Sequence, residues 1–281
     1  MGHGTLEPLG KGVYLFRWPR GVVVSPLLVT TEGVIAVDPI DAEAARAYRA
    51  AIRQLTDAPI RAVIYSHDHR DHIVGAAELG PEAEIIAHPR ARERILRRRD
   101  PDILLPTRLV QDEEELRFGQ HRVEVRYFGP NHSASNIGLL FETDAGRLLF
   151  FCDLVEPGLA PYRNLPDTDV LGLLETLAAC RTLGADLVLG GHAGPATAEW
   201  IDGYAQFFHE LLAATARAYR TQGGQAPLPG EDGVAMTERV HLAVCQEAAA
   251  ALRPRFGHWR GFDAWAPQTA DRLLLYLITG N

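Results

Sequence analysis

The stretch from Ser66 to Gly75, SHDHRDHIVG, places three histidines and two aspartates directly after an apolar run. His67 and His69 are two residues apart, so in an extended loop both side chains can point to the same side and bind one metal ion. Asp71 and His72 follow after a turn, where they could hold a second ion nearby. So many polar groups after a buried strand rarely lack a function. The spacing therefore predicts a site for two metal ions.

Two metal ions need more ligands than these four residues, and later parts of the sequence supply candidates. His132 in FGPNHSASN, Asp153 in LLFFCDLVEP and His192 in LVLGGHAGP each come just after an apolar, strand-like run. Strand ends in a sandwich converge on one edge, where rigid strands can position ligands. Each of the three would be a weak signal alone, and together they support the histidine cluster.

The elements that must position these residues alternate between strands and helices. Short β-branched runs broken by Gly and Pro predict strands, apolar residues at helical spacing predict helices, and Asp41 can cap the first helix. Two such rounds predict an α+β sandwich of two mixed sheets packed face to face, with helices outside. The expected strands and hairpins cover residues 12–16, 22–30, 33–39, 60–65, 83–88, 114–128, 136–153 and 185–191, and the expected helices cover 41–55, 75–79, 89–100 and 167–183.

The sequence TQGGQAPLPGEDG, residues 221–233, is the best linker candidate in the chain. It predicts a catalytic domain over residues 1–223 and a C-terminal helical extension over 224–281 that packs on it. The segment RFGHWRGFDAWAP within this extension brings several aromatic residues together. They could dock the extension on the core or form a wall of the substrate pocket, and the sequence leaves both open. These residues are Phe256, His258, Trp259, Phe262 and Trp265.

The bulk composition limits the partners. A net charge of −8 provides no basic field for nucleic acid, and we interpret Arg97–Arg99 beside Asp100 as a solvated helix end. Three scattered cysteines without CxxC spacing argue against disulfides and against a cysteine zinc site. We expect a small-molecule substrate and neither nucleic acid nor membrane as partner. Exposed helices would allow a homodimer.

The compartment is expected to be the cytoplasm. The first residues lack an apolar segment after a basic one, so they do not indicate a signal peptide, and no apolar run is long enough to span a bilayer. Lysine is rare beside abundant arginine and alanine, which is typical of a GC-rich bacterial genome. That bias says nothing about chemistry.

With these motifs, the chain resembles the metallo-β-lactamase superfamily. The family signature HxHxDH reads here as residues 67–72, followed by a distant His, a bridging Asp and a final His in the family's order. The likeness covers about residues 13–213. It implies the αβ/βα sandwich of that family, with the site at one edge of the two sheets.

The resemblance also implies a role for each ligand around two metal ions and a hydroxide between them. His67, His69 and His132 would bind the first metal, and Asp71, His72 and His192 the second. Asp153 would bridge the two ions. Asp38, in VIAVDP, matches a family aspartate that supports the site from behind, although a polar strand terminus is an equally good interpretation.

Two positions near the third histidine bear on substrate. Asn136 falls at the place of an asparagine that polarises the scissile carbonyl in the zinc β-lactamases of the cysteine-containing subclass. Glu156 stands where those enzymes carry a lysine that holds the drug's carboxylate. A carboxylate there would repel an anionic substrate, so we expect poor β-lactam hydrolysis unless Arg163 or another cation substitutes. With Asp153 in place of the cysteine ligand, all ligands are N or O atoms, so two Zn²⁺ are expected and iron or manganese is conceivable.

The function expected from this reasoning is hydrolysis of a carbonyl ester-like bond in a lactone, ester, thioester or lactam. Asp71 would orient the hydroxide and carry a proton to the leaving group, and Asn136 would donate to the developing oxyanion. Three alternatives stay open: an iron-dependent redox enzyme with the same ligands, a phosphodiesterase or nuclease of the same fold, and a non-catalytic binding protein. Metal analysis and a substrate panel separate them.

Overall fold

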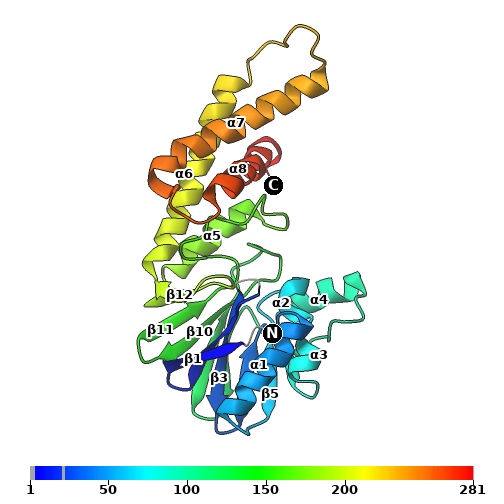
Figure 1. Ribbon diagram of the computed structural model, residues 1–281, viewed down its shortest axis with the longest axis vertical. Helices are drawn as coiled ribbons and strands as arrows, with labels where there is room; N and C mark the ends of the chain where they lie inside the picture. The colour runs from blue at the N-terminus through cyan, green and yellow to red at the C-terminus, as the bar shows by residue number, and fades with distance from the viewer. Residues whose placement is uncertain (1–3, 21–22, 281) are drawn as a thin grey trace.

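Two β-sheets lie face to face, and helices cover both outer faces (Figure 1). This computed structural model describes residues 4–20 and 23–280, so residues 1–3, 21 and 22 of the predicted catalytic domain, and residue 281 of the extension, lie outside it. The predicted α+β sandwich of mixed sheets is confirmed.

The first sheet has the strand order β1-β2-β3-β4-β5-β6-β7. Strands β1 to β4 pair antiparallel, and β4 to β7 pair parallel. The predicted strands omit β1 and β7, the two edges of this sheet, because β7 has only two residues and β1 is largely exposed and contains a proline. The strands are β1 Thr5–Gly10, β2 Val13–Trp18, β3 Val23–Thr30, β4 Gly33–Val37, β5 Ile60–Ile64, β6 Glu84–Ala87 and β7 Arg108–Leu109.

The second sheet has the order β13-β12-β11-β10-β9-β8, with β11 and β12 parallel and the other pairs antiparallel. Its side chains alternate between two cores. Leu139 and Phe141 pack against the first sheet, whereas Leu140 faces the outer helices. The strands are β8 Glu113–Phe118, β9 His121–Arg126, β10 Gly138–Thr143, β11 Gly146–Phe150, β12 Leu187–Leu189 and β13 Ala196–Thr197.

Helices α1 Ala42–Leu55, α2 Arg70–Ile73, α3 Ala76–Leu79 and α4 Pro89–Arg98 pack on the outer face of the first sheet. The Asp41 carboxylate accepts from the N–H of Ala44 at 2.8 Å, so the predicted cap of α1 is confirmed. Helices α5 Val170–Cys180 and α6 Glu199–Gln222 cover the outer face of the second sheet.

The C-terminal helices α7 Gly233–Phe256 and α8 Phe262–Thr279 pack on α6 and share one hydrophobic core with α5 and the second sheet. The predicted linker is the loop between α6 and α7, which extends away from the sandwich (Figure 1). The predicted boundary at residue 223 therefore falls at the end of a helix that contacts both parts, and the division into two domains stays a prediction. Cys152, Cys180 and Cys245 are buried and form no disulfide.

Candidate metal centre

The predicted ligands lie at one edge of the sandwich because the strand registers align the ends of their strands. Val37 pairs with Ile64 in the first sheet, and Phe150 pairs with Leu189 in the second, so the residues that follow these parallel strands emerge together. Two backbone hydrogen bonds hold these loops at this edge: one joins two ligand-bearing loops, and the other joins the loop of His192 to β3. Ile137 donates to the carbonyl of Ser66 at 2.9 Å, and Val24 donates to the carbonyl of Gly191 at 2.8 Å.

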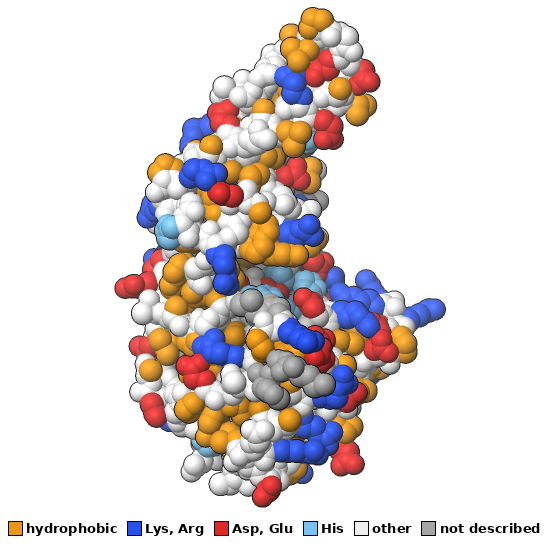
Figure 2. All heavy atoms as spheres, viewed as in Figure 1, with side chains coloured by type: hydrophobic (Ala, Val, Ile, Leu, Met, Phe, Trp, Pro, Cys, Tyr) orange, Lys and Arg blue, Asp and Glu red, His pale blue; other side chains and the backbone are white. Residues whose placement is uncertain are grey.

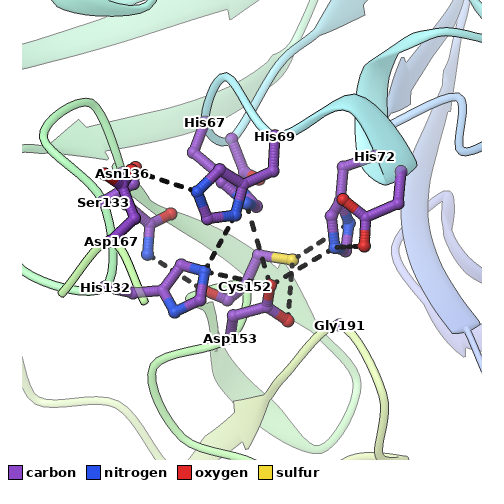
Figure 3. A network of polar contacts seen from close by, with 12 residues as sticks. His67, His69, His72, His132, Ser133, Asn136, Cys152, Asp153, Asp167 and Gly191 are labelled. Carbon is purple, nitrogen blue, oxygen red and sulfur yellow. Dashed lines mark hydrogen bonds and ion pairs between the residues drawn. The ribbon is translucent and has the colours of Figure 1, made fainter. Parts of the chain in front are cut away.

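Asp153 lies at the centre of the ligand cluster. Figure 3 shows His67, His69 and His132 on one side of it and His72 on the other. Its Oδ2 lies 3.2 Å from His132 Nε2 and 3.3 Å from His72 Nε2. The same oxygen is 3.7 Å from His67 Nε2, and the other oxygen, Oδ1, is 3.2 Å from His192 Nε2.

The side chains form two ligand groups that share this carboxylate. The first contains His67, His69, His132 and Asp153, and the second contains His72, Asp153 and His192. The Nε2 atoms of His67 and His72 are buried and have no hydrogen-bond partner. Leaving a buried polar atom unpaired is unfavourable, so these atoms fit the role of metal ligands. Imidazole and carboxylate donors suit zinc and also iron or manganese.

The surroundings of the cluster shift the pKa values of its buried histidines in opposite directions. Burial would raise the pKa of Asp153, but the neighbouring His72, His132 and His192 outweigh it and hold that pKa well below its usual range. Although burial opposes it, contact with Asp153 raises the pKa of His72 to about 10 and that of His192 to about 9. Burial among three other imidazoles holds the pKa of His67 well below its usual range. Because metal ligands must be deprotonated, metal binding here releases protons.

Asp38 supports this cluster from behind, at the end of β4. Its carboxylate accepts from the backbone N–H of Ser66 at 2.8 Å and from the Ser66 hydroxyl at 2.6 Å. The same hydroxyl lies 2.9 Å from Nδ1 of His67, which leaves Nε2 of that ring to face the ligands. Asp38 also lies 4.0 Å from Nδ1 of His72. These contacts favour the interpretation that Asp38 supports the site over the interpretation that it is only a polar residue at the end of a strand.

Asp167 holds His69 in place, and no motif or spacing in the sequence pointed to this residue. His69 Nδ1 faces His132 Nε2 at 3.2 Å, while its other nitrogen, Nε2, lies 3.1 Å from the Asp167 carboxylate. Arg94 of α4 donates to the same carboxylate oxygen at 2.7 Å. Such a carboxylate fixes the tautomer and the orientation of a metal-binding imidazole.

Asp68, between the first two histidines, links the loops that carry the first ligand group. Its buried carboxylate accepts from Arg94 Nε at 2.9 Å and from the Ser135 hydroxyl at 2.6 Å. Arg98 also pairs with it and donates to its backbone carbonyl. Arg97, Arg98 and Arg99 are exposed at the end of α4, as predicted, but Arg98 also holds this buried carboxylate. Arg97 forms an exposed ion pair with Glu93.

Glu156 joins the two loops of the second ligand group. Its carboxylate accepts from the backbone N–H groups of Asp153 at 3.2 Å, Gly191 at 2.6 Å and His192 at 2.9 Å. A Cβ on Gly190 would lie only 2.3 Å from this carboxylate, so glycine is required for the close approach. Because Glu156 also lines the pocket beside the ligands, the expected repulsion of anionic substrates stays a prediction.

The two predicted catalytic residues have different surroundings. Asp71 lies outside both ligand groups, with its Oδ2 3.8 Å from His72 Nε2 and its side chain 75% exposed. Asn136 is buried, and its amide nitrogen donates to the Cys152 carbonyl at 2.8 Å and to Asn131 Oδ1 at 3.2 Å. Both amide hydrogens are thus engaged within the protein, so the structure does not place Asn136 to donate to a substrate.

A pocket of about 540 Å³ opens beside the ligands. Figure 2 shows histidine side chains gathered where the sandwich meets the C-terminal helices, beneath a hydrophobic surface. His69, Asp71 and His132 line one side of the pocket, and Tyr162 and Trp265 line another part of its wall. The volume lies within the range typical of small-molecule sites.

Among the described residues, no helix is both long and apolar enough to cross a membrane.

Comparison with known proteins agrees with the fold. Residues 18–192, more than half of the chain, match the metallo-beta-lactamase superfamily. The chain belongs to this superfamily.

Among curated proteins, it is similar to the 2,4-dinitroanisole O-demethylase subunit alpha of Nocardioides sp. (strain JS1661), with 34% identity over 192 residues. The match covers 67% of this chain, which spans only 57% of that protein's length.

Solved metallo-beta-lactamases share the fold. The enzyme from Hirschia baltica superposes with a TM-score of 0.62 at 19% identity, covering 73% of this chain and 98% of that one. The enzyme from Erythrobacter litoralis, with beta mercaptoethanol in its active site, gives 0.62 at 20% identity, covering 75% and 98%. At such identities the likeness supports the fold and not a substrate.

Proposed function

We propose that this chain is a dinuclear zinc-dependent hydrolase that cleaves a carbonyl ester-like bond in a small molecule: a lactone, ester, thioester or lactam. The observation that carries the proposal is the shared carboxylate of Asp153, whose two oxygens face two groups of buried imidazoles. Two close divalent ions supply a hydroxide at neutral pH and polarise a carbonyl oxygen.

The protein's own residues would hold the metal ions and transfer the proton. His67, His69 and His132 would hold one ion and His72 and His192 the other, with Asp153 between them. The sequence prediction also made Asp71 a ligand of the second ion, but Asp71 lies outside that ligand group and is therefore proposed for proton transfer alone. Its carboxylate lines the pocket and is largely exposed, so it can take a proton from the attacking water and pass it to a leaving group.

A second candidate is cleavage of an aryl alkyl ether, because the curated relative is named as an O-demethylase of 2,4-dinitroanisole. A phosphodiesterase is disfavoured, since Arg260 is the single arginine or lysine among the described residues that line the pocket. An iron-dependent redox enzyme would use the same N and O ligands.

A substrate panel with zinc-loaded protein tests the proposal. It contains a chromogenic cephalosporin, an aryl ester, a simple lactone, a glutathione thioester, an aryl phosphodiester and 2,4-dinitroanisole, with His132→Ala as the control. Turnover of one carbonyl substrate that depends on His132 supports the hydrolase. Release of 2,4-dinitrophenol alone selects the ether-cleaving candidate. A panel without turnover, together with iron as the metal bound on purification, overturns the zinc hydrolase.

A further inference from the structure

The pocket beside the metal centre is lined by both polar and apolar side chains. Five of the predicted ligands form part of this lining, and the rest of the wall is formed largely by apolar side chains of the loop after β11, of α5 and of α6. Among these are Leu159, Pro161, Leu165, Leu173 and Phe208. A substrate that presents its reacting group to the ligands must therefore place its remainder against an apolar surface.

Two aromatic rings in contact with each other form part of this lining. Tyr162, in the loop, and Trp265, on α8, contact each other with ring centroids 5.1 Å apart and ring planes at 74°. Both line the pocket, and Tyr162 is 59% exposed. The Arg163 guanidinium lies 5.8 Å from the centroid of the Tyr162 ring, and the exposed remainder of this ring is available to a ligand. Aromatic rings prefer to pack against other rings in such offset or edgewise arrangements.

Trp265 differs from the other aromatic residues of the C-terminal extension. Phe256, Trp259 and Phe262 are buried in the core, where Phe256 and Trp259 contact Phe207 of α6. These residues dock the extension, whereas Trp265 is only partly buried and faces the pocket. Docking of the extension therefore describes Phe256, Trp259 and Phe262, and a role in the pocket wall describes Trp265.

The extension also holds the pocket loop in shape. The backbone of Arg260 donates to the Gly158 carbonyl at 2.9 Å and accepts from the Ala160 N–H at 3.0 Å. On α8, the Thr269 hydroxyl donates to the Arg163 carbonyl at 3.0 Å, and Arg272 donates to the Thr168 carbonyl at 2.8 Å. The wall opposite the metal ligands is thus fixed by residues from the C-terminal part of the chain.

We propose that the non-reacting part of the substrate is an aromatic ring that packs against Tyr162 and Trp265, so that the C-terminal extension selects the substrate. This inference rests on the proposed function, because the reacting bond must face the metal ligands. One arginine in the lining, Arg260, accommodates at most a singly charged substituent on the ring. The substrate class is then an uncharged or monoanionic aromatic ester or lactone.

Two esters of nearly equal size and reactivity test the inference. Methyl phenylacetate and methyl cyclohexylacetate differ only in whether the ring is aromatic, and each kcat/KM is divided by the rate of hydrolysis in hydroxide. We expect the phenyl ester to be preferred by about 2- to 12-fold, the range of a single aromatic contact. The cyclohexyl ring is the more hydrophobic of the two, so burial alone would give the opposite order.

The preference must depend on the two rings. Trp265→Ala and Tyr162→Ala should each reduce it towards 1, while Trp265→Phe, which keeps an aromatic ring and guards against misfolding, should retain it. Trp200→Ala is the matched control, because Trp200 packs against Trp259 outside the pocket lining. A preference that is absent in the wild type, or unchanged in both alanine variants, overturns the inference.

A binding measurement separates this inference from the proposed function. Phenylmethanethiol and cyclohexylmethanethiol both present a thiolate to a zinc-loaded site, and isothermal titration gives their affinities without turnover. Tighter binding of the phenyl thiol, lost in Trp265→Ala, supports the aromatic site even if neither ester is hydrolysed, an outcome that would overturn only the hydrolase. Equal affinities overturn the aromatic site even if esters are cleaved.

Discussion

Nε2 of His69 lies 3.1 Å from Oδ2 of Asp167, a residue 98 positions further along the chain, and Arg94 of α4 donates to that same oxygen at 2.7 Å. The carboxylate therefore joins a predicted metal ligand to the loop that also forms the pocket wall.

The first prediction concerns this carboxylate. Asp167→Asn keeps the shape of the side chain but removes its charge, so the His69 imidazole becomes a weaker ligand. We expect about a 10- to 100-fold loss of zinc affinity or activity, measured by competition with a chromophoric chelator. Asp112→Asn is the control, because Asp112 contacts His88 away from the metal ligands. Unchanged affinity and activity in Asp167→Asn would show that Asp167 does not position His69.

The second prediction concerns the buried carboxylate of Asp68. Removing both guanidinium groups with Arg94→Ala and Arg98→Ala leaves a buried charge without its partners, which should lower the free energy of unfolding by about 3–5 kcal/mol. Arg97→Ala should change it by less than about 1 kcal/mol, because Arg97 forms only an exposed ion pair with Glu93. Urea denaturation of the zinc-loaded proteins measures both. A double variant as stable as Arg97→Ala contradicts the prediction.

The third prediction concerns metal removal. The buried Nε2 atoms of His67 and His72 have no hydrogen-bond partner, so metal should stabilise the folded chain. With free zinc at 100 times its dissociation constant, the gain at one site is about 2.7 kcal/mol. Differential scanning fluorimetry with zinc and then with a chelator should show a higher and then a lower Tm. The double variant His67→Ala, His72→Ala should lose most of this response, and a full response there would mean that zinc binds elsewhere.

The fourth prediction separates two roles of Asn136. Its amide donates to the Cys152 carbonyl and to Asn131 Oδ1. Asn136→Ala should therefore lower the free energy of unfolding by about 1–3 kcal/mol. Folded protein that carries both zinc ions should retain most of its kcat. A kcat loss of about 10²- to 10³-fold at unchanged stability would instead support the role in oxyanion stabilisation expected from the sequence.

The fifth prediction concerns the approach of Glu156 to the end of β12. Gly190→Ala places a methyl group about where the Glu156 carboxylate lies, so the hydrogen bonds to the loops of Asp153 and His192 should be lost. We expect destabilisation of about 1–3 kcal/mol, as for other overpacked sites, together with weaker zinc binding. Gly224→Ala, where a Cβ meets nothing within 4 Å, should behave as the wild type. Normal zinc affinity in Gly190→Ala would show that Glu156 is not needed to position the second ligand group.

The sequence by itself determined the sandwich and most residues of the candidate ligand cluster. Alternating apolar residues, as in Leu139 to Phe141, fix which face of a strand is buried, and this pattern is local. The ligand motif at His67 to His72 is also local, because one loop carries it. Where strands end is therefore visible in the sequence, and so are the polar side chains that follow them.

Only the tertiary structure decided which polar groups contact the candidate metal ligands and which form hydrogen bonds elsewhere within the fold. Asp167, Arg94 and Glu156 act through contacts with residues far away in the chain, and no spacing rule connects such positions. Asn136 is the opposite case. Its position near a ligand in the sequence suggested a catalytic role, whereas its amide donates to a carbonyl within the fold. Side-chain direction and hydrogen-bond partners depend on packing between distant segments, which a linear pattern does not encode.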